Sequence, residues 1–247
     1  TKERKSSLIL GHRGAMGIAP ENTIISFQTA LDQKVDIIEL DVHLSRDKKL
    51  VVIHDEKVDR TTDGTGLVRD MTSRQIKKLD AGIKFSKKFR NARVPFLEEV
   101  MELLKGNSVR LNIELKNGPV FYPGIEEKIS RMIDQYNSYD RTIVSSFDHL
   151  SLKRLKELNN RIPTAILYGN NLLNFKKYVR ELRVSAVHPH YFWVTPGLIR
   201  QMHGMNIAVN TWIINTEKDF IRFSRMGVDA IGTNFPGSFA HFRDKKA

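Results

Sequence analysis

Short hydrophobic runs alternate along the chain with longer segments in which hydrophobic residues recur every three or four positions. The short runs, rich in branched residues, predict nine strands: SLIL, DIIELDV, LVVIHD, RLNIEL, TIVSSF, TAILYG, SAVHPH, IAVNTW and AIGTN. The longer segments predict amphipathic helices: TIISFQTALDQ, FLEEVMELLKG, GIEEKISRMIDQYN, HLSLKRLKELNN, NLLNFKKYVREL, PGLIRQMHGMN and EKDFIRFSRMG. This alternation is typical of βα units around a parallel sheet.

The second and third strand runs are separated only by the short stretch LSRDKK. A parallel crossover needs about a dozen residues or more, so these two runs must form an antiparallel hairpin. Eight strands then remain for a closed parallel sheet, and 247 residues match the roughly 250 of a (β/α)8 TIM barrel. We therefore predict an α/β fold, a single TIM-barrel domain over residues 1–247, with a small rim insertion at about 55–95 after the second barrel strand. The alternative, an open doubly wound sheet, lacks a GxGxxG motif after any strand.

Composition narrows the possible partners. The chain has no cysteine, so a metal would be held by oxygen or imidazole ligands. No apolar run approaches the 18 or so residues of a membrane span, and stable membrane insertion is not expected. The net charge of +12 comes from short, scattered clusters, which favour anionic surfaces or substrates over nucleic acid, and a small-molecule substrate is expected. The oligomeric state stays open.

The start of the chain bears on localisation. Its basic region is followed by only a short apolar stretch, so no signal peptide is visible and a cytoplasmic protein is expected. Because the chain begins at Thr1, the alternative is a secreted protein whose leader was removed before that residue.

A TIM barrel places its chemistry at the C-terminal ends of its strands. Eight titratable or charged residues fall at such ends here: His12, Arg13, Glu39, Asp41, His54, Asp55, Glu114 and Lys116. Residues two apart on a strand share a face, so Glu39 projects with Asp41 and Glu114 with Lys116. An acid inside an apolar strand is costly to bury unless it is paired or bound to metal.

The types of these residues indicate a chemistry. The carboxylates Glu39, Asp41 and Glu114 make a hard oxygen site suited to Mg²⁺ or Ca²⁺. Arg13 and Lys116 offer cations to a phosphate. His12 and His54 titrate near neutrality and are candidates for an acid and a base. Together they predict metal-assisted phosphoryl transfer from a small phosphodiester.

Ordered motifs carry a family resemblance over nearly the whole chain, from Leu8 to about Pro236. They are HRG with PENT, ELDVHLSRDKKLVVIHD, TTDGTG, PFLEEV, NIELK, VSSF, NTWIIN and GVDAIGTNFP. In this order they resemble the glycerophosphodiester phosphodiesterase family. The resemblance implies a TIM barrel, a divalent cation, and hydrolysis of glycerophosphodiesters to glycerol 3-phosphate and an alcohol, by way of a cyclic phosphate formed by the substrate's 2-hydroxyl.

The resemblance also implies roles for individual residues. His12 and His54 would be the acid/base pair, and Glu39, Asp41 and Glu114 the metal ligands. Arg13 and Lys116 would hold the phosphate, with Trp212 of the NTWIIN motif beside the substrate, while Glu21 and Asn22 of PENT would support the site. Gly11 and Gly14 would let the backbone approach a phosphate closely.

One residue and one aromatic stretch leave the substrate range open. Asn234 stands where many members of the family have an acid, which puts the substrate range in question more than the reaction. The aromatic stretch Tyr191–Trp193 either packs beneath a helix or forms an apolar wall for an acyl or choline-like group. The alternatives are therefore a related phosphodiesterase acting on lysophospholipids or other phospholipids, and a non-catalytic barrel that binds glycerol-phosphate polymers.

Overall fold

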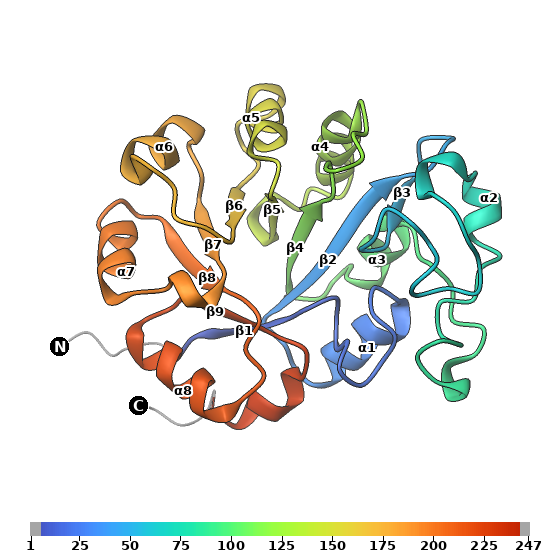
Figure 1. Ribbon diagram of the computed structural model, residues 1–247, viewed down its shortest axis with the longest axis horizontal. Helices are drawn as coiled ribbons and strands as arrows, with labels where there is room; N and C mark the ends of the chain where they lie inside the picture. The colour runs from blue at the N-terminus through green and yellow to red at the C-terminus, as the bar shows by residue number, and fades with distance from the viewer. Residues whose placement is uncertain (1–5, 243–247) are drawn as a thin grey trace.

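A closed barrel of eight parallel strands forms the centre of the protein in the computed structural model, which describes residues 6–242 (Figure 1). The barrel order is β1-β9-β8-β7-β6-β5-β4-β2, and pairing of β1 with β2 closes it. The strands are β1 (Leu8–Gly11), β2 (Ile37–Leu44), β3 (Leu50–Val52), β4 (Arg110–Leu115), β5 (Thr142–Ser146), β6 (Thr164–Tyr168), β7 (Ala186–Pro189), β8 (Ala208–Thr211) and β9 (Ala230–Thr233). β3 pairs antiparallel with β2 and lies outside the closed ring. The TIM barrel and the hairpin predicted from the sequence are thus confirmed.

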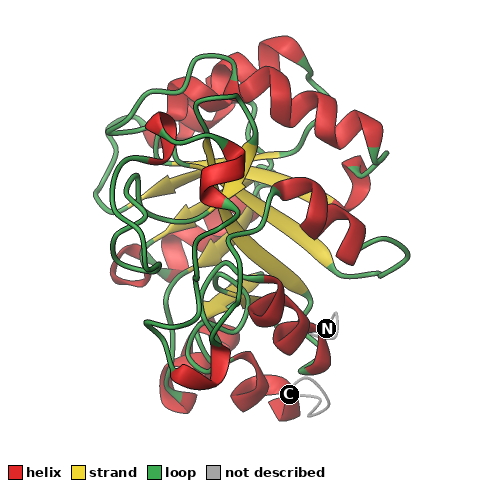
Figure 2. Cartoon of the chain, turned by 90° about the vertical axis from the view of Figure 1, so that its right-hand side faces the viewer, coloured by secondary structure: helices red, strands yellow, loops and turns green. Residues whose placement is uncertain are grey.

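Helices surround the strands (Figures 1 and 2). They are α1 (Ile24–Asp32), α2 (Ser73–Ile76), α3 (Leu97–Leu103), α4 (Ile125–Gln135), α5 (His149–Leu158), α6 (Phe175–Leu182), α7 (Pro196–His203) and α8 (Glu217–Met226). Short 3-10 helices are η1 (Val68–Asp70), η2 (Lys87–Phe89), η3 (Tyr139–Arg141), η4 (Tyr191–Trp193) and η5 (Pro236–Phe242). None of the helices described is long and apolar enough to cross a membrane.

Local sequence explains where several helices begin. Thr23, Thr195 and Thr216 each cap a helix by accepting a hydrogen bond from a backbone N–H of its first turn. The segment NLLNFKKYVREL predicts a helix from Asn171, but α6 begins only at Phe175 because Asn174 has a left-handed backbone, with φ 52°. The C-terminal ends of the strands therefore lead into loops of differing length, and these loops carry the polar residues of interest.

The segment between β3 and α3 lies beside the barrel and contains α2, η1 and η2. Its own small hydrophobic cluster packs against the outer hairpin strand; the cluster consists of Val51, Ile53, Val58, Val68, Ile76, Ala81 and Val94. β3 ends at Val52, so His54 and Asp55 follow the strand and do not end it as predicted. The expectation about a leader concerns the chain before Ser6, which lies outside the described residues.

Candidate active site

A cavity of about 90 Å³ opens at the C-terminal end of the barrel, where the sequence places its candidate residues. Its lining includes His12, Arg13, Glu39, His54, Glu114, Lys116 and Trp212. A larger cavity of about 1050 Å³ lies at the other end of the strands, and none of the candidate residues lines it. The candidate chemistry is therefore gathered at one end of the barrel, in the smaller cavity.

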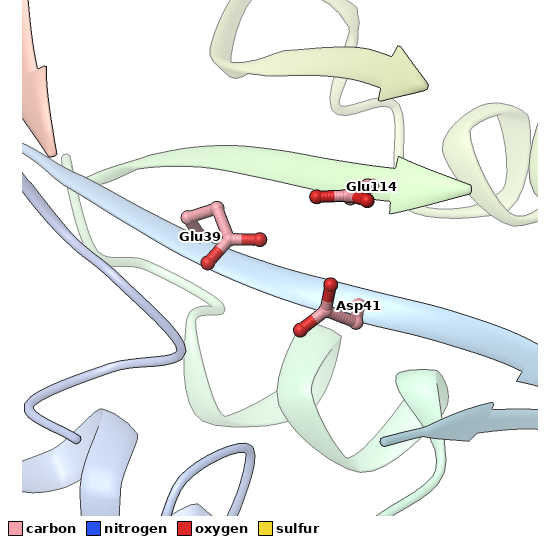
Figure 3. Close-up of side chains that lie close together, drawn as sticks. All are labelled: Glu39, Asp41 and Glu114. Atoms are coloured by element: carbon pink, nitrogen blue, oxygen red, sulfur yellow. The ribbon is translucent and has the colours of Figure 1, made fainter. Parts of the chain in front are cut away.

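Three carboxylates meet at this cavity, which Glu39 and Glu114 line, because β2 and β4 are paired in register, with Asp41 opposite Glu114. Figure 3 shows the side chains of Glu39, Asp41 and Glu114 turned toward one another, and one oxygen of each lies within 4.8 Å of the others. Burial and the neighbouring acids raise the pKa of Glu39 well above its usual range and that of Glu114 to about 7. Burial also favours neutral Asp41, but Arg13 and Lys116 override it and lower the Asp41 pKa.

Two cations partly offset the negative charge of this cluster. Lys116 Nζ lies 2.8 Å from Glu114 Oε1 and 3.7 Å from Asp41 Oδ1. Arg13 Nε lies 3.3 Å from Asp41 Oδ2, and Arg13 Nη1 donates to Glu21 Oε1 at 2.8 Å. Both predicted phosphate-binding residues are thus held in ion pairs at the edge of the cavity, beside the carboxylates.

The loop after β1 is folded tightly against α1. The backbone N–H of Arg13 donates to Glu39 Oε2 at 2.8 Å, and Asn22 Nδ2 donates to Asp41 Oδ2 at 2.8 Å. A Cβ at Gly14, where φ is 84°, would lie 2.5 Å from Ser26 Oγ. The structure therefore explains Gly14 by its packing on α1, where the sequence suggested close approach to a phosphate.

The two histidines have different partners. His12 Nδ1 lies 2.8 Å from Asn234 Oδ1, so the imidazole donates there and Nε2 is left with its lone pair. His54 Nδ1 lies 2.6 Å from Asp55 Oδ1, and Lys116 Nζ lies 3.2 Å from His54 Nε2. Burial lowers the pKa of His12 to about 4 and also lowers that of His54. Both shifts favour the neutral imidazole.

A residue that sequence reasoning missed, Arg60, connects the two sides of the site. Its guanidinium donates two hydrogen bonds of 2.8 Å to Glu21, and Nε donates to Asp55 Oδ2 at 2.7 Å. Arg13, Glu21, Arg60, Asp55 and His54 thus form one continuous chain of polar contacts. No pattern in the sequence marks Arg60, because it lies in an irregular segment.

Two further contacts were also missed. His43, on the same face of β2 as Asp41, donates from Nε2 to the backbone oxygen of His54 at 2.8 Å and lies 2.9 Å from the Tyr122 hydroxyl. The rule that residues two apart share a face could have found His43. Asn234, which the sequence placed near the rim of the site, also accepts a hydrogen bond from the His12 imidazole.

Trp212 forms part of the apolar side of the cavity. Its indole donates to the backbone oxygen of His188 at 2.9 Å, and its ring meets Phe147 edge-on with centroids 5.8 Å apart. Residues 191–193 do not line the cavity. Trp193 donates to the Gly169 backbone oxygen, while Phe192 is 75% exposed.

The fold and the site together define a TIM-barrel enzyme with an acidic centre flanked by cations and imidazoles. Comparison with known families identifies it more closely: residues 12–238 match the model of the glycerophosphoryl diester phosphodiesterase family. The chain belongs to this family.

Individual relatives agree with the family match. The chain is 43% identical over 230 residues to a glycerophosphodiester phosphodiesterase of Caldanaerobacter subterraneus, covering 93% of this chain and 95% of the relative. It is 38% identical to one of Bacillus altitudinis, covering 96% and 98%.

Solved structures share the fold. A glycerophosphodiester phosphodiesterase of Agrobacterium tumefaciens superimposes with a TM-score of 0.83 at 31% identity, covering 95% of this chain and 99% of that one. A phosphodiesterase of Oleispira antarctica, solved in complex with the product sn-glycerol-3-phosphate, gives a TM-score of 0.87 at 26% identity, covering 97% and 98%.

Proposed function

We propose that this protein hydrolyses glycerophosphodiesters to glycerol 3-phosphate and an alcohol, with a bound divalent cation and with His12 and His54 as proton carriers. The observation that carries the proposal is the cluster of three carboxylates at a cavity that two cations and two imidazoles also line. The names of the relatives and the product bound in the Oleispira antarctica structure support the same substrate class.

The donor set fits a hard divalent cation. Three carboxylates share a small volume, and burial beside one another raises the pKa values of Glu39 and Glu114. Asn112 Oδ1, on the same face of the cavity, is buried without a hydrogen-bond partner and is a fourth oxygen that a cation could use. Oxygen ligands of this kind favour Mg²⁺ or Ca²⁺. When bound, such an ion would offset negative charge on the phosphoryl oxygens.

The residues around the cluster would position the phosphate and move protons. Once the carboxylates are neutralised, the nearby charges of Arg13 and Lys116 become available to a phosphate oxygen. One imidazole takes the proton of the attacking 2-hydroxyl, whose oxygen bonds to phosphorus. The other imidazole takes up a proton from solvent once the anionic substrate is bound, and it donates this proton to the alcohol oxygen as the bond from that oxygen to phosphorus breaks. Water then opens the cyclic phosphate to give glycerol 3-phosphate.

One feature favours a second substrate class. Phe147 and Trp212 give the cavity an apolar side. This side would suit a leaving alcohol with a methylated amine, as in choline, or the acyl chain that a lysophospholipid carries on its glycerol.

A substrate panel tests the proposal. The purified protein is assayed against soluble glycerophosphodiesters and lysophospholipids, first after exhaustive treatment with EDTA and then with Mg²⁺ or Ca²⁺ restored. We expect no turnover without metal and recovery with it, and Glu39→Gln and Asp41→Asn should need more metal to reach half of their maximal rate. Full turnover after exhaustive chelation would overturn the metal assignment, and no turnover of any phosphodiester would overturn the proposed activity.

A further inference from the structure

Exposed hydrophobic side chains gather on the loops that leave the C-terminal ends of the barrel strands. Phe121, Phe147, Leu173 and Phe192 follow β4, β5, β6 and β7, and they are 55%, 50%, 92% and 75% exposed. In the loops that lead into these strands, no large hydrophobic side chain of the described residues is exposed. The four side chains, which we call the apolar rim, therefore lie on the face that carries the catalytic cavity.

The same loops are nearly free of acidic residues. Residues 116–124, 169–174, 190–195 and 212–216 contain no Asp or Glu. The loop after β5 contains only Asp148, which lies 3.2 Å from Arg154. Exposed Lys176 and Lys177 lie in the first turn of α6, just after the loop that carries Leu173, and Lys177 Nζ lies 3.8 Å from Glu181 Oε1. This arrangement makes the rim apolar at its loop tips and positive beside them, in a chain of net charge +12.

We propose that the apolar rim docks this face of the protein on an anionic lipid surface. Aromatic and leucine side chains at loop tips suit the boundary between headgroups and acyl chains, while neighbouring lysines are attracted to anionic headgroups. Docking of this kind is peripheral and needs no spanning helix. Docking would turn the cavity toward the headgroups. If the proposed function holds, phosphodiesters that carry an acyl chain would then reach the cavity from the lipid surface.

Vesicle co-sedimentation tests the proposal directly. The probes are vesicles of phosphatidylcholine alone and of phosphatidylcholine mixed with phosphatidylglycerol. The double variant Leu173→Ser/Phe192→Ser removes two rim side chains that do not line the cavity. The matched control is Leu158→Ser, which changes a 50% exposed leucine at the C-terminal end of α5, away from the rim.

We expect the unmodified protein and Leu158→Ser to bind the anionic vesicles, with affinity that falls as salt is raised. The double variant should bind at least about tenfold more weakly, because two apolar side chains no longer leave water. Absence of binding by the unmodified protein, binding that is equal on both kinds of vesicle, or equal binding by the double variant and the control would each overturn the proposal. Hydrolysis of a soluble glycerophosphodiester, measured on all three proteins, should be equal; its loss in all three would count against the proposed function and not against docking.

Discussion

The substitution Glu114→Gln should stabilise the protein in the absence of metal. Burial and Asp41 raise the Glu114 pKa from 4.5 to about 7, even with Lys116 Nζ at 2.8 Å. Below its unfolded pKa this carboxyl is uncharged in both the folded and the unfolded state. As pH rises, the carboxyl ionises first in the unfolded state, so the free energy of unfolding falls until pH passes the folded pKa. The raised pKa of Glu114 therefore lowers the free energy of unfolding by about 3 kcal/mol at pH 8. The amide of Gln keeps an oxygen that can accept a hydrogen bond from Lys116 but carries no charge.

Thermal unfolding in EDTA measures this effect. For a chain of this size, 3 kcal/mol raises Tm by about 6 °C or more. The gap between Glu114→Gln and the unmodified protein should be widest near pH 8 and small near pH 4.5. The matched control is Glu157→Gln, at a 59% exposed side chain on α5, which should change stability by no more than about 0.5 kcal/mol.

Addition of Mg²⁺ or Ca²⁺ completes the test. The metal should stabilise the unmodified protein and should stabilise Glu114→Gln much less, because one ligand charge is gone. If Glu114→Gln is no more stable than the unmodified protein in EDTA at pH 8, the carboxylate cluster does not carry the electrostatic cost described here. Equal stabilisation of both proteins by metal would remove Glu114 from the set of ligands.

Three further measurements address the reaction and the barrel. His12→Ala and His54→Ala should each lower kcat/KM by about 10²- to 10⁴-fold. The double variant should lose little more than either single variant, because the two histidines act as a unit, and losses that multiply would contradict this. A substrate analogue without the 2-hydroxyl should inhibit competitively and resist hydrolysis, and its rapid turnover would mean that water attacks phosphorus directly. Burial lowers the pKa of His188 from 6.5 to about 4, so the free energy of unfolding should fall by about 2 kcal/mol between pH 7 and pH 5 on its account. In His188→Gln this part of the pH dependence should disappear in denaturant titrations.

Much of the fold and the position of the site could be predicted because both depend on local patterns. Strand periodicity gave the eight barrel strands, and the shortness of LSRDKK gave the hairpin. The rule that chemistry collects at the C-terminal ends of barrel strands predicts the cluster of Glu39, Asp41 and Glu114 that the structure shows.

The contacts that could not be predicted join residues across irregular segments. Arg60 lies in a stretch without periodicity, and Asn234 reaches His12 from 222 positions away. Such pairings depend on how loops fold over the barrel, which hydrophobic patterns do not encode. The end of β3 at Val52 was also not predicted. Val51 and Ile53 pack against the segment that follows, and this contact is not encoded in the hydrophobic pattern.

The position of Arg60 limits how freely the segment between β3 and α3 can be exchanged. Segments outside a barrel are attractive places for grafting loops from relatives, because they lie outside the closed ring of strands. Here one guanidinium from that segment balances Glu21 and Asp55 at the same time. A graft that keeps Asp55 but omits this arginine would leave Glu21 with Arg13 as its cation and Asp55 with the His54 imidazole, next to an already acidic centre. Chimeras made here should therefore be designed to keep an arginine at position 60.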